Sequence, residues 1–166
     1  MSLAANSIRI EPLGAGHDRL SFHCGNDSLN RYIHEQAGQD ARRDTARVFV
    51  AVAPDRERTI RGFFTLSAAT VVAIELPPEM QKRLPRYPIP AAVIGRLAVD
   101  LGSRGLGLGR ILLADAVRKA QVAAATVAMA VIVVDPVDEA ARAFYAKFGF
   151  TSLNGPQRRM FLAVPA

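Results

Sequence analysis

"SRGLGLGRILLADAV", residues Ser103–Val117, places three glycines in one short turn and then continues directly into a segment with an apolar stripe. Glycine weakens local structure unless the fold or a ligand requires its backbone freedom. The preceding stretch "AAVIGRLAV", Ala91–Val99, is a nearly continuous apolar run and predicts a buried central strand. We expect the turn to span Asp100–Gly109 and a helix to span Arg110–Val122. A strand, a glycine-rich turn and a helix in this order direct backbone N–H groups and the positive helix end toward an anion.

The composition fits one globular domain spanning residues 1–166, because half of the residues are hydrophobic and 22% are charged. No apolar run approaches about 18 residues, so we expect no membrane span. The N-terminal stretch lacks a basic start followed by an apolar block, which argues against a secretion signal. Cys24 is the only cysteine, which excludes an internal disulfide and favours a reducing, cytoplasmic location. His17, His23 and His34 do not have metal-site spacing, so we expect no metal.

The charge balance favours a phosphate-bearing ligand. Lysine and arginine number 21 against 15 acidic residues, and the isoelectric point is about 10.2. Such a surface attracts a nucleotide cofactor, a nucleic acid or an acidic partner. A net charge that merely keeps a small protein soluble is the alternative explanation.

Hydrophobic periodicity and turn residues predict elements in the order β-α-β-β-β-α-β-α-β-β. The expected strands are Ile8–Pro12, Ala46–Ala53, Ile60–Ser67, Ala91–Val99, Thr126–Val134, Phe150–Leu153 and Arg159–Val164. The expected helices are Ser28–Asp40, capped by Asn26, Asp27 or Ser28, then Arg110–Val122, and a third that begins at the cap Asp135 and ends at Gly149. The proline-rich segment Leu76–Pro90 predicts at most a short helix around Glu79–Arg83. This order predicts an α/β fold with a mixed central β-sheet flanked by helices.

Two nucleotide-binding patterns fail at the glycine turn. The Walker pattern ends in Gly-Lys-Ser/Thr, whereas Gly109 is followed by Arg-Ile. In a Rossmann pattern starting at Gly105 the third glycine would fall on Arg110, and that turn normally follows the first strand of its domain. The pattern that is present is Arg104-x-x-Gly107-x-Gly109, directly after "RLAVD".

This pattern resembles, with no substitution, the R/Q-x-x-G-x-G/A signature of the GNAT superfamily of acyl-CoA-dependent N-acyltransferases. The resemblance implies a single-domain GNAT fold and acetyl-CoA as acyl donor, with its pyrophosphate wrapped by the turn. It also implies that the strand before the turn splays from its neighbour and pairs with the pantetheine arm, with Gly95 as a candidate bulge. The residues assigned to the cofactor by the resemblance are Leu97, Ala98, Val99, Arg104, Gly105, Leu106, Gly107, Leu108, Gly109 and Arg110.

The stretch "DEAARAFYAKFGF", residues 138–150, resembles the later helix of the same family, where a tyrosine lies beside the acetyl-CoA sulfur. The resemblance assigns to Tyr145 the role of catalytic general acid, which protonates the departing CoA thiolate. Tyr145 shares an apolar stripe with Ala141, Phe144 and Phe148. From the residues alone, a core aromatic is therefore the alternative role.

Three longer stretches are similar to the GNAT toxins of bacterial toxin–antitoxin pairs. They are "FHCGNDSLNRYIHEQAGQDARRDTARVFVAV" (22–52), "GFFTLSAATV" (62–71) and "LPRYPIPAAVIGRLAVD" (84–100). This resemblance implies acetylation of the α-amine of an aminoacyl-tRNA, which blocks translation, a ribbon-helix-helix antitoxin as partner, and a homodimer. Asn30 departs from the acidic residue expected in many relatives, and we expect it to alter a helix-face contact without affecting catalysis.

An aminoacyl ester lowers the basicity of its α-amine, so the amine is a neutral nucleophile near pH 7 without a dedicated protein base. The acids Glu75, Glu79 and Asp100 form no paired arrangement that would mark such a base. Cys24 has no activating partner in the sequence and is expected to be a buried small residue. Candidate phosphate contacts for tRNA are Arg31, Arg42, Arg43, Arg47, Arg83 and Arg86, each also compatible with an ordinary solvated arginine.

Two other functions stay open at this point. One is a GNAT enzyme that acetylates a small amine or a protein amine, whose activity would survive high salt. The other is a non-catalytic GNAT-fold binding protein, which would show no turnover that depends on Tyr145. No helix-turn-helix pattern supports a DNA-binding role, and the sequence does not specify which tRNA is the acceptor.

Overall fold

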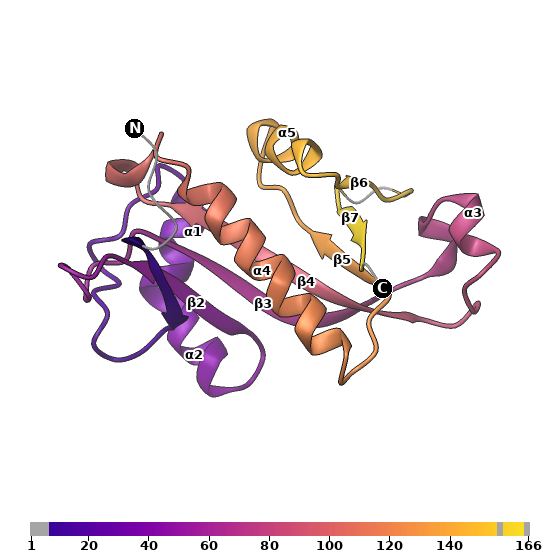
Figure 1. Ribbon diagram of the computed structural model, residues 1–166, viewed down its shortest axis with the longest axis horizontal. Coiled ribbons are helices and arrows are strands. Elements are labelled where there is room, and N and C mark those ends of the chain that lie inside the picture. Colours follow the sequence, from indigo (N-terminus) through magenta and orange to yellow (C-terminus); the bar gives the residue numbers. More distant parts are fainter. Residues whose placement is uncertain (1–6, 156–157, 165–166) are drawn as a thin grey trace. The chain divides into compact units, whose positions relative to one another are not determined.

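The structure is a computed structural model that describes residues 7–155 and 158–164, so residues 1–6 of the stretch considered for a secretion signal lie outside it. The strands are β1 (Arg9–Pro12), β2 (Arg47–Val52), β3 (Gly62–Val71), β4 (Ile89–Val99), β5 (Val131–Val134), β6 (Thr151–Ser152) and β7 (Met160–Ala163). The α-helices are α1 (Asp27–Arg31), α2 (Ala37–Arg42), α3 (Pro78–Gln81), α4 (Leu108–Ala124) and α5 (Glu139–Lys147) (Figure 1). A π-helical segment, Tyr32–Gln36, joins α1 to α2, and short 3-10 turns cover Ala73–Glu75 and Leu101–Ser103.

The strands form one seven-stranded sheet in the order β1-β2-β3-β4-β5-β7-β6. β4 and β5 run parallel, whereas the β1–β2, β2–β3, β5–β7 and β6–β7 pairs are antiparallel. The predicted α/β class with a mixed sheet is confirmed. The chain divides into two compact units, the first built from the chain up to Ser67 together with Arg96–Ala116, the second from Ala68–Gly95 and the chain from Val117 onward.

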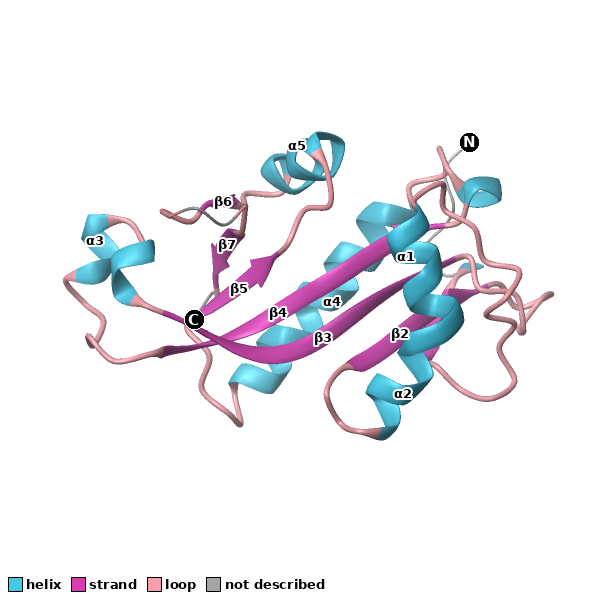
Figure 2. Cartoon of the chain, turned by 180° about the vertical axis from the view of Figure 1, so that it is seen from behind, coloured by secondary structure: helices cyan, strands magenta, loops and turns pink. Residues whose placement is uncertain are grey.

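In the first unit, two neighbouring residues of β3 show how helices cover both faces of the sheet. Phe63 is fully buried against Phe22 and Tyr32, with ring centroids 5.3 and 6.1 Å away, so the segment from α1 to α2 packs on its face. Gly62 points to the opposite face, because side chains alternate along a strand. A Cβ there would lie 2.8 Å from Leu112 Cδ1 of α4. Figures 1 and 2, which view the chain from opposite sides, show α4 in front of β3 in one view and α1 and α2 in front of it in the other.

The predicted single helix Ser28–Asp40 is interrupted, which corrects the sequence interpretation. Asn26 caps α1 by accepting a hydrogen bond from the Leu29 N–H, as one of the predicted caps. The Ala37 N–H then donates to the Tyr32 carbonyl, five residues back, which is the π-helical spacing. In a regular α-helix Gln36 would follow Tyr32 onto the core face. The extra residue of the π turn buries Ala37 there and leaves Gln36 exposed.

In the second unit, apolar residues of β4, β5 and β7 form the core. Ala91–Ile94 of β4 pair in register with Val131–Val134 of β5, which in turn pair with Met160–Ala163 of β7. β5 is shorter than the predicted strand Thr126–Val134, because the chain first turns at the end of α4. There the Val127 N–H donates to the Ala123 carbonyl (2.9 Å), and Val127 is exposed although it is apolar.

The predicted cap of the last helix is wrong, whereas its predicted stop is right. Asp138, not Asp135, caps α5, because its Oδ1 accepts from the Ala141 N–H at 2.8 Å. The Asp135 carboxylate is instead paired with the Arg159 guanidinium, 2.8 Å away. Gly149 has a φ of +93° just after α5, the left-handed conformation with which glycine ends a helix.

The remaining boundaries differ by a few residues. β3 continues to Val71 beyond the predicted end at Ser67, and β4 begins at Ile89 before the predicted start at Ala91. The one helix of the proline-rich segment is the four-residue α3, in agreement with the prediction of a short helix, and the last two residues of the segment, Ile89 and Pro90, begin β4. No helix of the described residues is long and apolar enough to cross a bilayer.

Replacing Gly62 by valine should lower the free energy of unfolding by about 2–3 kcal/mol, the range typical of overpacking. The new Cβ would stand 2.8 Å from Leu112 Cδ1 and 3.0 Å from the Ala98 carbonyl oxygen, and backbone cannot swing away as a side chain can. Denaturant unfolding measures the change. Gly16→Ala is the control, because its Cβ meets nothing within 4 Å, and it should stay within about 0.5 kcal/mol of the parent. Equal stabilities of the two variants would show that α4 does not pack tightly on β3.

Candidate functional site

Two glycines of the turn before α4 adopt backbone conformations that side chains disfavour. Gly105 and Gly107 have φ values of +77° and +83°. A Cβ at either position would meet nothing within 4 Å, so the left-handed conformation, and not crowding by the protein, accounts for glycine here. The turn therefore presents bare backbone next to open space.

The first turn of α4 supplies hydrogen-bond donors beside this space. α4 begins at Leu108, two residues before the predicted start, and the Ile111 N–H donates to the Gly107 carbonyl (3.3 Å). The N–H groups of Leu108, Gly109 and Arg110 lie in the turn that has no acceptors inside the helix. The Leu108 side chain is buried in the core, so this residue offers only its backbone. Donors and the positive helix end together can hold a pyrophosphate.

Asp100 fastens the start of the glycine turn, a role that the sequence interpretation missed. Its Oδ1 accepts from the His23 N–H (2.9 Å) and its Oδ2 from the Gly102 N–H (3.0 Å). The Leu101 N–H also donates to the His23 carbonyl (2.9 Å). Asp100 is therefore a structural acceptor and not a general base, and only its place at the start of the turn hinted at this.

Arg104 extends the same connection. Its Nη2 donates to the Cys24 carbonyl (2.5 Å), while the Cys24 N–H donates to Oδ1 of the buried Asn30 (2.8 Å). The "FHCG" stretch is thus joined to the glycine turn through backbone atoms of His23 and Cys24. The Asn30 side chain thus holds the backbone of Cys24, and the altered helix-face contact expected from its departure from an acidic residue remains a prediction. The Arg104 guanidinium is engaged here, which leaves its backbone for the turn.

Cys24 itself has the properties of a buried structural residue. Its side chain is 2% exposed, and burial raises the pKa of the thiol, which lowers the thiolate fraction and so the reactivity. Its Sγ contacts the Asn26 carbonyl at 3.8 Å. The structure gives this thiol no activating base.

The residues predicted to meet the pantetheine arm lie at the end of β4. The register between β4 and β5 ends at Ile94, and Leu97, Ala98 and Val99 follow in the part of β4 that belongs to the first unit. Ala98 is buried, whereas Leu97 and Val99 are half-buried. Gly95 stands where the register ends, and its bulge remains a prediction.

Tyr145 lies in the second unit on α5 and is both a core aromatic and a phenol held in its protonated form. Its side chain is 5% exposed and makes edge-to-face contacts with Phe144 and Phe150, at centroid distances of 5.4 and 5.6 Å. Burial raises the pKa of the Tyr145 hydroxyl above its ordinary range, and the negative charge of Asp135 raises it further. The hydroxyl therefore keeps its proton at neutral pH, as a general acid requires.

The six arginines proposed for phosphate contacts fall into two groups. Arg31, Arg42, Arg43 and Arg47 are exposed along α1, α2 and the start of β2 in the first unit, and Arg47 is paired with Asp44 at 2.9 Å. Arg83 and Arg86 are exposed in the second unit, between α3 and β4. Four of the six arginines are therefore exposed within one stretch of the first unit, residues 31–47.

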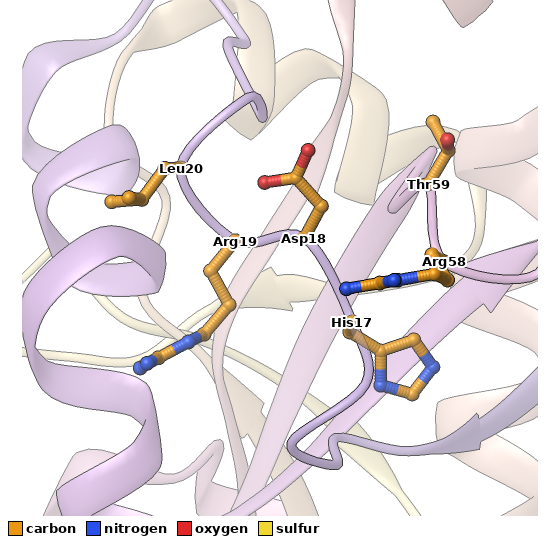
Figure 3. Close-up of a pocket in the computed structure, with 6 residues that line it drawn as sticks. All are labelled: His17, Asp18, Arg19, Leu20, Arg58 and Thr59. Atoms are coloured by element: carbon orange, nitrogen blue, oxygen red, sulfur yellow. The ribbon is translucent and has the colours of Figure 1, made fainter.

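A cavity of about 430 Å³ in the first unit had no counterpart in the sequence interpretation. Figure 3 shows the six residues that line it, which are His17, Asp18, Arg19, Leu20, Arg58 and Thr59. Two hydrogen bonds hold its walls together, from the Asp18 N–H to the Arg58 carbonyl (2.7 Å) and from Arg58 Nε to the Gly16 carbonyl (3.0 Å). The described residues contain no group of three or more histidine, cysteine or acidic side chains that could hold a metal ion.

Comparison with known proteins identifies the family. The model of the acetyltransferase (GNAT) family matches residues 22–150. The chain is 33% identical over 133 residues to a tRNA-acetylating toxin of Mycobacterium tuberculosis, covering 80% of this chain and 78% of the relative. It is 30% identical over 164 residues to the probable toxin TacT of Sinorhizobium fredii, covering 93% and 90% of the two chains.

Solved structures agree with this family. AtaT complexed with acetyl-methionyl-tRNAfMet superposes with a TM-score of 0.88 at 29% identity, covering 94% of each chain. A tyrosine-to-phenylalanine mutant of the AtaT toxin, bound to acetyl-CoA and the C-terminus of the antitoxin AtaR, gives a TM-score of 0.80 at 25% identity, covering 95% and 93%. The predicted fold and resemblance are confirmed: the chain belongs to the GNAT family of acetyltransferases.

Proposed function

We propose that this chain is a toxin that transfers the acetyl group of acetyl-CoA to the α-amine of an aminoacyl-tRNA and so blocks translation. The observation that carries the proposal is its likeness, over nearly the whole chain, to AtaT in complex with an acetylated methionyl-tRNA. The relative named a tRNA-acetylating toxin supports the same acceptor. The family supplies the reaction class and acetyl-CoA as donor.

The turn before α4 is the proposed binding site for the donor. The N–H groups from Gly105 to Arg110 would take the pyrophosphate in the open space beside Gly105 and Gly107. The backbone of Leu97, Ala98 and Val99 would pair with the pantetheine arm as an added strand does. Arg104 and Leu106 are the remaining residues of the proposed donor site. The Arg104 side chain holds the turn in place through its hydrogen bond to the Cys24 carbonyl.

The proposed chemistry is direct transfer. The neutral α-amine attacks the thioester carbonyl carbon, a C–N bond forms and the C–S bond breaks. The amine loses one proton to solvent, and the departing CoA thiolate receives one from Tyr145, which regains it from solvent. The buried Tyr145 phenol carries its proton at neutral pH and is therefore in the form that can donate, although its raised pKa makes it a weaker acid than a tyrosine in water.

The acceptor site would use the basic surface. A tRNA is a polyanion, and the net charge of +6 favours its approach. The exposed Arg31, Arg42 and Arg43 remain the proposed phosphate contacts of the first unit, and Arg83 and Arg86 those of the second. Arg47 is the weaker candidate of the set, since it is already paired with Asp44.

Two partners complete the proposal. We infer an antitoxin as partner, supported by the complex of AtaT with the C-terminus of AtaR. Its ribbon-helix-helix type and a homodimer as the working form are inferred from the resemblance to GNAT toxins alone. Co-purification of the chain with the product of an adjacent gene and its mass in solution test these two inferences.

The direct test of the function offers labelled acetyl-CoA in parallel to charged tRNA, to polyamines and to a peptide mixture. Label in the tRNA fraction is the expected result, and sequencing of that fraction names the acceptor. Label found only in amines or peptides would show that tRNA is not the acceptor, whereas the assignment as an acetyltransferase would stand. Absence of label from every fraction would contradict the enzyme assignment.

Gly107→Val should raise the KM for acetyl-CoA about tenfold or more, because a β-branched residue cannot hold a φ of +83° and its side chain would enter the proposed pyrophosphate space. Gly155→Val is the matched control, since Gly155 also has a positive φ (+117°) and no neighbour within 4 Å of its Cβ. The control should lose stability and keep its KM. An unchanged KM in Gly107→Val would remove the turn from the cofactor site.

Tyr145→Phe should lower kcat by about 100-fold or more, the contribution typical of a general acid, while acetyl-CoA affinity stays within about twofold. Tyr32→Phe is the control, because Tyr32 is equally buried and its hydroxyl donates to Asp40 Oδ2 at 2.9 Å. That variant should lose about 1 kcal/mol of stability and keep kcat. Steady-state kinetics and denaturant unfolding separate the two effects, and full activity of Tyr145→Phe would reduce Tyr145 to a core aromatic.

The pH profile of kcat should stay flat between about pH 7.5 and 9.5. A tyrosine of ordinary pKa near 10 would begin to lose its proton, and with it activity, in the upper part of this range. The raised pKa of Tyr145 moves that loss to higher pH, because the acid form is the one that burial favours. A loss of kcat that sets in below about pH 9 as the pH rises, and that is absent in Tyr145→Phe, would contradict the raised pKa of Tyr145 while still tying the activity to its hydroxyl.

A further inference from the structure

Two arginine side chains from different segments meet over a glycine in α2. Arg19 belongs to the loop after β1, and Arg42 ends α2. Their Nη1 atoms lie 3.0 and 3.3 Å from the position that a Cβ of Gly38 would occupy. The two guanidinium groups are therefore neighbours, and all three residues belong to the first unit.

Gly38 has no local reason to be glycine. It lies inside α2, where glycine weakens a helix relative to alanine, and its φ is not positive. A Cβ would instead crowd the Arg19 guanidinium, with the Arg42 guanidinium next to it. The missing side chain thus makes room for the two cations.

The two positive charges repel one another, and no acidic side chain within residues 7–155 and 158–164 forms an ion pair with either. Among the ion pairs of the residues that the structure describes, none involves Arg19 or Arg42. The acids closest to Arg42 in sequence are engaged elsewhere, Asp40 with the Tyr32 hydroxyl and Asp44 with Arg47. Two unpaired guanidinium groups that converge on one point favour an anion between them, and arginine suits phosphate in particular.

Arg19 also lines the cavity of about 430 Å³, so one member of the pair borders that cavity. Figure 3 shows Arg19 and Asp18 pointing to opposite sides of the loop, with His17 and Arg58 on the side away from Leu20. Hydrogen bonds from Ser21, with a smaller contribution from the charge of Arg58, hold the pKa of Asp18 below its ordinary value. Its carboxylate is therefore charged, and it points away from Arg19 (Figure 3). Leu20 is 77% exposed at the rim, an apolar surface beside the cations.

The position of this pair separates it from the proposed pyrophosphate turn. The segment from α1 to α2 packs against Phe63 on one face of β3, whereas α4 packs against Gly62 on the other. The donor would therefore use one face of the first unit. An anion held over Gly38 belongs to a second phosphate-bearing molecule.

We propose that Arg19 and Arg42, over Gly38, bind a backbone phosphate of the RNA acceptor, with the adjoining nucleotide in the cavity beside Arg58. The proposal rests on the proposed function and adds Arg19, Gly38 and Arg58 to its acceptor site. The chemistry recognised is a phosphodiester in a polyanion, so binding falls steeply with salt. A small aminoacyl ester, which has no phosphate, does not use this site.

The test measures equilibrium binding of fluorescein-labelled uncharged tRNA to the full chain between 50 and 200 mM KCl. Arg19→Ala/Arg42→Ala should weaken binding at least tenfold at 100 mM KCl and reduce the slope of log K against log salt by about 1, because one phosphate contact is lost. Gly38→Gln keeps every charge but fills the space, and should weaken binding severalfold without lowering the melting temperature. Arg118→Ala, which removes one exposed arginine from α4, is the charge-matched control for the single variants Arg19→Ala and Arg42→Ala and should change affinity less than threefold.

Acetyl transfer to an aminoacyl methyl ester and the affinity for acetyl-CoA complete the experiment. Both should be unchanged in the double variant if only the RNA contact is lost, and loss of both would make its effect structural and overturn the site. Binding of tRNA by the double variant within twofold of the parent would overturn the site while leaving the proposed function intact. A parent chain that neither binds nor acetylates tRNA would overturn both.

Discussion

One carboxylate ties the glycine turn to the rest of the first unit. Asp100 accepts from the His23 and Gly102 N–H groups, and Arg104 reaches the Cys24 carbonyl from the other end of the same turn. These two anchors enclose the 3-10 turn Leu101–Ser103, and the left-handed Gly105 and Gly107 follow directly after Arg104, before α4 begins at Leu108. Pre-ordering of this kind lowers the entropy that a ligand must remove when it binds. The donor site thus depends on contacts made by residues that touch no donor.

The tight approach of α4 to β3 sets the second constraint. Leu108 and Leu112 lie against Gly62, so the first turns of the helix cannot shift relative to the strand without a steric conflict. The packing of α4 on β3 therefore also fixes the position of the N–H groups in the first turn of α4. Placement of an anion site on a rigid helix is more exact than placement on a loop alone.

The sequence predicted those parts of the molecule that follow from local chemistry. The glycine turn was recognisable because left-handed conformations need glycine, and the helix stop at Gly149 for the same reason. The anchors were not, since Asp100 and His23 lie 77 positions apart and only the fold brings them together. Likewise the pairing of Asp135 with Arg159 overrode its capping propensity, and Val127 looked like a strand residue although it ends in an exposed turn. Arg19 and Arg42 illustrate the same limit, because neither residue alone differs from a surface arginine.

The reactivity of Cys24 can be used to measure how stably the glycine turn is attached to the segment around residues 22–26. Cys24 is the only thiol, it is buried, and its backbone bears both the Arg104 and the Asn30 hydrogen bonds. A thiol reagent can reach it only when the segment around residues 22–26 opens, so its labelling rate in the native protein measures how often the connection to the glycine turn breaks. Ligands that hold the turn closed would slow that rate, which makes an inert cysteine a gauge of cofactor occupancy.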